Sequence, residues 1–145
     1  MVVESISSTN RIVATESISS ALSYLLGFLR NFSNAVLVGH NILNFDANIL
    51  LHALEKTEML VDFKSIVHGF TDSLHMFKLR HPGMDSYSQE NLVKALLHEE
   101  YSAHEAVEDT AMLEKLCTDV SSNEKLESSA TVSCIIDKYK YCQMK

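Results

Sequence analysis

Residues that favour turns and cross-links are scarce in this sequence. One proline and four glycines in 145 residues argue against collagen-like, low-complexity and turn-rich all-β architectures. The three cysteines are odd in number and have no Cys-x-x-Cys spacing. This pattern predicts reduced thiols rather than a disulfide framework or a zinc site.

Long apolar runs are also missing. Residues 1–16 lack the apolar core of a signal peptide. The most apolar stretch, residues 18–32, is interrupted by serines, Gly27 and Arg30, and it is too short and too polar to span a bilayer. We therefore expect a nuclear or cytoplasmic protein that is not secreted and has no membrane partner.

Positive charge is in the minority, with 12 Lys+Arg against 19 Asp+Glu and a formal net charge of −7. The basic residues are scattered, which argues against a protein that grips nucleic acid mainly by neutralising its phosphates. A site that holds phosphates through bound metal is not excluded. The hydrophobic content of 46% and the charged content of 21% are typical of a single globular domain.

The spacing of apolar residues predicts helices that alternate with buried strands. Helical periodicity predicts helices over about residues 18–30, 45–57, 73–81, 86–98 and 102–118. Short apolar runs predict strands at 35–38 and 66–71. Thr15 or Ser17 is the expected N-cap of the first helix, and Ser86-x-x-Gln89 is the expected capping box of the fourth.

This alternation indicates an α/β fold with parallel strand pairing. Two strands are too few for a stable sheet, so we expect the C-terminal part of a larger α/β domain. The expected organisation is a tail over residues 1–14, a domain over 15–120 and a C-terminal extension over 121–145, which contains a marginal segment at 132–141.

Asp109 interrupts the apolar stripe of the last predicted helix, which otherwise runs through Ala106, Leu113 and Leu116. A buried carboxylate is costly unless it is paired or binds a metal ion. Asp109 is therefore either a metal ligand or a residue at the edge of the stripe that reaches water or a neighbouring partner.

Asp46 follows the first predicted strand and starts the next helix. Capping and the helix dipole alone favour an aspartate there, but the carboxyl ends of parallel strands also carry the ligand sites of α/β sheets. His40 and Asn41 lie in the same loop. Both are candidates for groups that contact a substrate or support a bound ligand, and both could equally be turn residues.

His104 lies five residues before Asp109. On a helix this spacing separates two side chains by about 140°, so they cannot share a face if both are helical. In the turn before the helix, His104 could instead lean over a ligand held by Asp109. An imidazole titrates near neutrality and suits a general base; the alternative is an exposed histidine beside Glu105 and Glu108.

Two motifs resemble those of a known family. Val38-Gly-His-Asn-x-x-x-Phe45-Asp46 resembles the second motif of the DEDDh 3′–5′ exonucleases, and His104-x-x-x-x-Asp109 resembles their third motif. The resemblance covers about residues 18–120 and implies a ribonuclease H-like fold, in which helices flank a mixed sheet. The segments 22–32, 44–54 and 86–106 are most similar to the exonuclease-like C-terminal domain of promyelocytic leukaemia protein and its fish relatives.

The resemblance also implies a chemistry. Members of this family hydrolyse nucleotides from the 3′ end of DNA or RNA, using two divalent ions, Mg²⁺ or Mn²⁺, held by four carboxylates. By this resemblance Asp46 and Asp109 would be metal ligands, and His104 would be the base that deprotonates the attacking water. The bound ions would also let an acidic protein bind the 3′ end of a single strand, an anionic substrate.

The first motif of that family, Asp-x-Glu on the leading strand, occurs nowhere in the 145 residues. We therefore expect an N-terminally truncated fold, an incomplete catalytic set, and hydrolysis that is absent or impaired. The strand at 35–38 would then have an open apolar edge, available for self-association or for a protein partner. The alternatives are a non-catalytic module that binds protein or nucleic acid, and a helical fragment whose motif matches are coincidental.

Overall fold

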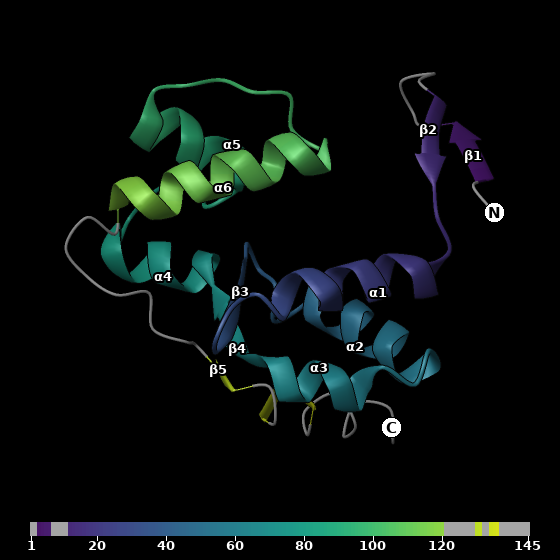
Figure 1. The fold of residues 1–145 in the computed structure, drawn as a ribbon. Coiled ribbons are helices and arrows are strands. Elements are labelled where there is room, and N and C mark those ends of the chain that lie inside the picture. Colours follow the sequence, from purple (N-terminus) through teal and green to yellow (C-terminus); the bar gives the residue numbers. More distant parts are fainter. Residues whose placement is uncertain (1–2, 7–11, 121–129, 132–133, 137–145) are drawn as a thin grey trace, which may run out of the picture.

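Two parallel strands, β3 (Ala35–Gly39) and β4 (Val67–Asp72), lie at the centre of the fold. The computed structural model describes residues 3–6, 12–120, 130–131 and 134–136. A short strand, β5 (Ala130–Thr131), pairs antiparallel with β4, which gives the sheet order β3-β4-β5. Helices flank this sheet (Figure 1), so the predicted α/β class with a parallel strand pair is confirmed.

The register of β3 and β4 brings the ends of the two strands together. Val38 pairs with Thr71, and Gly39 pairs with Asp72. The loops that follow the two strands therefore begin side by side, at the edge of the sheet where α/β folds place their ligand sites.

Several helices follow the predicted order. They are α1 (Ile18–Leu29), α2 (Asp46–Lys56) and α4 (Ser73–Arg80). The side chain of Ser17, one of the two caps predicted from the sequence, caps α1 by accepting a hydrogen bond from the Ser20 amide. Because proline disfavours helical backbone in the residue before it, α4 ends before Pro82.

The helix predicted over residues 86–98 begins differently. The predicted capping box at Ser86 is wrong, because Ser88 is the N-cap and its side chain accepts a hydrogen bond from the Asn91 amide. From there α5 (Gln89–Leu92) continues into a π-helical turn, η1 (Val93–Leu97). It ends at His98, whose φ of 57° is left-handed and cannot continue a right-handed helix.

Other elements also depart from the prediction. The last helix, α6 (Ala106–Val120), begins after the predicted position 102, because His104 has a left-handed φ of 76°. A seven-residue helix, α3 (Leu60–Ile66), is too short to show a clear period in the sequence. Near the N-terminus, β1 (Val3–Ile6) and β2 (Ile12–Thr15), which the sequence did not predict, pair antiparallel, and Figure 1 shows them away from the central sheet.

Buried apolar side chains form two clusters. The first cluster, which includes Leu51, Phe63 and Phe70, packs α1, α2 and α3 on the sheet. The second cluster, which includes Phe77 and Leu116, joins α4, α5 and α6. The second cluster thereby holds the segment with the His104 and Asp109 motif against the helix that follows β4.

The described part of the C-terminal extension also packs on the fold, since Ile135 and Ile136 are buried in the first cluster. Of the predicted segment at 132–141, only residues 134–136 are among the described residues. Cys142 also lies outside them. The domain limits at residues 14 and 120 remain predictions. None of the helices in the described part of the chain has the length and apolar character that a membrane span requires.

Candidate functional site

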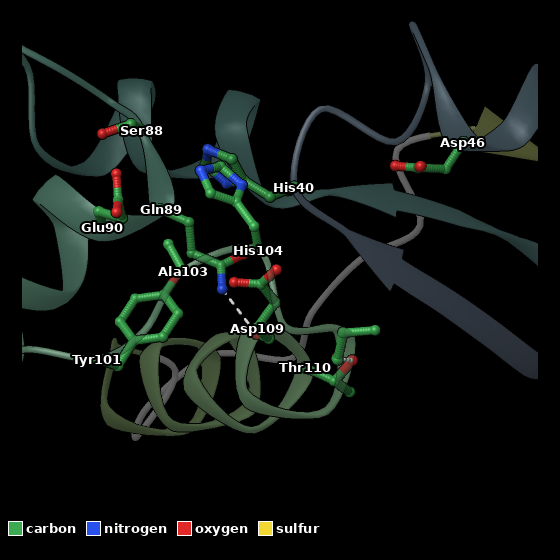
Figure 2. Close-up of a pocket in the computed structure, with 11 residues that line it drawn as sticks. His40, Asp46, Ser88, Gln89, Glu90, Tyr101, Ala103, His104, Asp109 and Thr110 are labelled. Atoms are coloured by element: carbon green, nitrogen blue, oxygen red, sulfur yellow. Dashed lines mark hydrogen bonds between the residues drawn. The ribbon is translucent and has the colours of Figure 1, made fainter. Parts of the chain in front are cut away.

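A pocket of about 450 Å³ lies beside the loop after β3 and the N-terminal ends of α5 and α6. Of the residues singled out from the sequence, His40, Asp46, His104 and Asp109 line it. Figure 2 shows them with Tyr101 and other lining residues. Two motifs that are far apart in the sequence therefore meet at one site.

The pocket lies between the two core clusters. The first cluster holds α2, which begins with Asp46, and the second holds α6, which carries Asp109. Asp46 is exposed, and in Figure 2 it lies apart from the other labelled side chains. The separation of the two carboxylates is therefore set by how the two clusters pack against each other.

Asp109 is half-buried in the first turn of α6 and has a neighbouring partner. Burial, together with the hydrogen bond and the negative charge of Asp109, raises the pKa of Tyr101 to about 12. The phenol therefore stays protonated at neutral pH and can donate to the carboxylate. Gln89 Nε2 donates to the Asp109 backbone carbonyl at 2.6 Å, which ties α5 to α6 (Figure 2).

His104 lies in the turn before α6 and not on the helix. From this turn its side chain lines the pocket. Its side chain is exposed, and within the described residues its ring makes no hydrogen bond or ion pair. Its left-handed φ of 76° is uncommon for a residue other than glycine and is a form of local strain that clusters at functional sites.

His40 connects the end of β3 to two other segments. Its Nε2 lies 2.7 Å from the backbone carbonyl oxygen of Tyr87, and since a carbonyl only accepts, Nε2 carries a proton. Its Nδ1 lies 2.9 Å from Oγ of the fully buried Ser73, a hydroxyl that can either donate or accept a hydrogen bond. With both nitrogens engaged, His40 positions the loop before α5 rather than offering a ring nitrogen to the pocket.

Asn41 does not line the pocket. Its amide donates to Asp72 Oδ1 at 2.9 Å, and its side-chain oxygen accepts from Asn44 Nδ2 at 2.8 Å. The buried carboxylate of Asp72 also accepts from the amides of Leu43 and Leu74, at 3.3 and 3.0 Å. Asp72 thus fixes the loop after β3 to the start of α4.

Three side chains that shape the site were not predicted as site residues from the sequence: Asp72, Gln89 and Tyr101. For Asp72, the available signal was its position between a predicted strand and a helix. Gln89 was expected only as part of a capping box, and no pattern marked Tyr101; the contacts of both with Asp109 join separate segments.

The acidic groups at the pocket do not fit the two-ion site that the motif resemblance implies. Among the described residues, no group of three or more His, Cys, Asp or Glu side chains is arranged to hold a metal ion. The carboxylates that line the pocket, Asp46, Glu90 and Asp109, would set three negative charges against the four positive charges of two Mg²⁺ ions, and such ions are normally held by more oxygen ligands.

Comparison with known proteins identifies the family. A family model described as exonuclease matches residues 6–117, which is most of the chain. No curated protein matches the chain. Members of the matched family hydrolyse nucleic acid and typically use divalent metal ions. With the α/β sheet and both motifs at one pocket, the match shows that this chain belongs to the exonuclease family of the ribonuclease H-like superfamily.

Proposed function

We propose that the pocket binds the 3′ end of a single-stranded DNA or RNA in the manner of a DEDDh 3′–5′ exonuclease, within a domain over residues 15–120 of a nuclear or cytoplasmic protein. The observation that carries this proposal is the pocket itself. Asp46 from the second motif lines the same pocket as His104 and Asp109 from the third motif.

The proposed general base is His104. Its exposed ring has no hydrogen-bond partner within the described residues, so it can accept a proton from the attacking water. In that step the water oxygen bonds to phosphorus, and the bond from phosphorus to the 3′ oxygen of the preceding nucleotide breaks. Asp46 and Asp109 are the proposed metal-binding carboxylates of a complete site.

We infer that hydrolysis by residues 1–145 alone is absent or impaired. The inference is supported by the missing Asp-x-Glu motif and by the lack of a three-residue metal group among the described residues. Mg²⁺ or Mn²⁺ is the cofactor that a complete site would hold, but the two motif carboxylates, Asp46 and Asp109, provide too few oxygen ligands for two such ions.

A second candidate function is a non-catalytic interaction module of promyelocytic leukaemia protein type. The observation that favours it is a folded pocket whose acidic side chains, within the described residues, form no group arranged to hold a metal ion. Such a module would bind protein or nucleic acid without requiring a free 3′ end.

Binding to linear and circular strands separates the two functions. Fluorescence anisotropy would compare a linear single-stranded oligonucleotide with a circular one of the same sequence, with and without Mn²⁺. We expect tighter binding of the linear strand and a Mn²⁺-dependent part that Asp109→Asn weakens. Glu105→Gln, at an exposed neighbouring position, is the control. Equal binding of both strands would favour the interaction module.

The absence or impairment of hydrolysis is tested separately, with a 5′-labelled oligonucleotide that has a free 3′ hydroxyl. We expect no shortening above the protein-free rate in Mg²⁺ or Mn²⁺. Clear shortening that is lost in Asp109→Asn would contradict the impairment and mean that another residue completes the site.

A further inference from the structure

Tyr101 is the only phenylalanine, tyrosine or tryptophan among the described residues that line the pocket. It lies in the segment between η1 and α6, and its side chain packs against the second core cluster. The side chain is half-buried, so it contacts the core and still reaches the pocket. No step of the proposed hydrolysis uses this ring.

The hydroxyl of Tyr101 is held at the pocket wall. It donates a hydrogen bond to the Asp109 carboxylate and forms another with the side chain of Gln89, and in Figure 2 the three side chains lie close together. Gln89 is in turn bonded to the Asp109 backbone carbonyl at 2.6 Å. A ring that is already fixed by packing and hydrogen bonds loses little conformational entropy when a ligand covers it.

The charges at the pocket favour contact with an uncharged part of a ligand. Neither Lys nor Arg is among the described residues that line it, whereas the carboxylates of Asp46, Glu90 and Asp109 are. Without a bound metal ion these carboxylates repel the phosphates of a nucleotide, and the base is the part that carries no charge. The cavity volume of about 450 Å³ is within the range of roughly 300–1,000 Å³ that is typical of small-ligand sites.

We propose that the face of the Tyr101 ring stacks on the base of the 3′-terminal nucleotide, and that this contact needs no metal ion. The inference rests on the proposed function, because a strand end must enter the pocket. Every base has a π-face, so stacking on a tyrosine ring tolerates any sequence. Tyr101 thereby gives the pocket affinity for a strand end even where the set of metal ligands is incomplete.

Oligonucleotides that differ only at their last nucleotide test this contact. Fluorescence anisotropy in EDTA would compare an intact linear single strand with one whose 3′-terminal nucleotide lacks its base but keeps its phosphate and 3′ hydroxyl. We expect the wild type to bind the intact strand about fivefold or more tightly, because one base–aromatic stack is lost with the base. A strand that lacks one internal base is the control for stacking elsewhere.

Variants of Tyr101 separate the ring from the hydroxyl. Tyr101→Leu should abolish the preference for the intact 3′ end, whereas Tyr101→Phe, which keeps the ring, should retain most of it. The matched control is Tyr24→Leu, because Tyr24 in α1 is 70% exposed and does not line the pocket; it should keep the full preference. The effect of a missing internal base should be the same in all of these proteins.

Equal binding of the intact and the abasic 3′ ends by the wild type would overturn the proposal, and this comparison does not depend on any variant folding. A preference that survives in Tyr101→Leu, or one that Tyr101→Phe loses to the same extent, would also overturn it. The proposed function fails by a different result, which is equal binding of linear and circular strands. A retained preference for the linear strand, with equal binding of the two 3′ ends, would overturn the role of Tyr101 alone.

Discussion

At the scale of single residues, Asp72 joins the two loops that leave the sheet. Its buried carboxylate accepts hydrogen bonds from the amides of Asn41, Leu43 and Leu74. We expect Asp72→Asn to lower the free energy of unfolding by roughly 1–3 kcal/mol, because the new amide has one acceptor oxygen and leaves a buried N–H without its partner. Urea unfolding measures the change. Asp85→Asn, at an exposed position, is the control, and an equal loss in both variants would contradict the role of Asp72.

Tyr101 makes the free energy of unfolding depend on pH in the alkaline range. Burial and the hydrogen bond to Asp109 raise its pKa from 10.0 to about 12, so the folded state holds the phenolic proton more tightly than the unfolded state. This contribution is fully present below pH 10.0 and is lost as the pH rises toward about 12. We expect the unfolding free energy of the wild type to fall more steeply over this range than that of Tyr101→Phe.

The matched control for that experiment is Tyr24→Phe, because Tyr24 is 70% exposed. Its pH profile should follow the wild type. A Tyr101→Phe profile that coincides with the wild type would mean that Tyr101 is not coupled to Asp109.

The site residues that could be predicted from the sequence are those in short motifs. Asp46, His104 and Asp109 each belong to such a motif, so each could be proposed as a site residue before the structure was known. The contacts of Tyr101 and Gln89 with Asp109 depend instead on the packing of α5, α6 and the intervening loop. The spacing of residues along the chain does not predict such contacts.

At the scale of secondary-structure elements, two glycines differ in what surrounds them. A Cβ at Gly39, the last residue of β3, would lie 2.7 Å from Ile42 Cβ, whereas a Cβ at Gly27 in α1 would meet nothing within 4 Å. We expect Gly39→Ala to destabilise the protein by roughly 1–3 kcal/mol through overpacking. Gly27→Ala should stabilise it by about 0.5–1 kcal/mol, because alanine favours helix.

Thermal unfolding of both variants checks this pair, and the opposite signs make each the control for the other. A Gly39→Ala variant as stable as the wild type would show that the loop after β3 can move away from the strand. Such freedom would contradict the tight positioning of His40 and the neighbouring pocket wall.

Helices with a local start or stop signal, or with a long apolar period, could be predicted from the sequence. Short strands could not. Ser17 and Pro82 mark the limits of α1 and α4 by local chemistry. In contrast, β1 and β2 have four residues each, which is too few for an alternating pattern to be recognised. The late start of α6 depends on the left-handed backbone of His104, a conformation that residue type alone does not indicate.

At the scale of the whole molecule, the pocket depends on two core clusters packing together. The first cluster holds the helix that begins with Asp46, and the second holds the helix that carries Asp109. His40 bridges them through Ser73 and Tyr87. Binding of a strand end at the pocket should therefore stabilise segments from both clusters at once.

Hydrogen exchange of the whole chain, with and without a linear single-stranded oligonucleotide in Mn²⁺, tests this account most directly. We expect slower exchange for the amides of the loop after β3, residues 40–46, and of the segment before and within the first turn of α6, residues 101–109. The amides of α3 should be unchanged, because no residue of α3 lines the pocket. Protection confined to other segments, or none at saturating oligonucleotide, would contradict the assignment of this pocket as the nucleic-acid site.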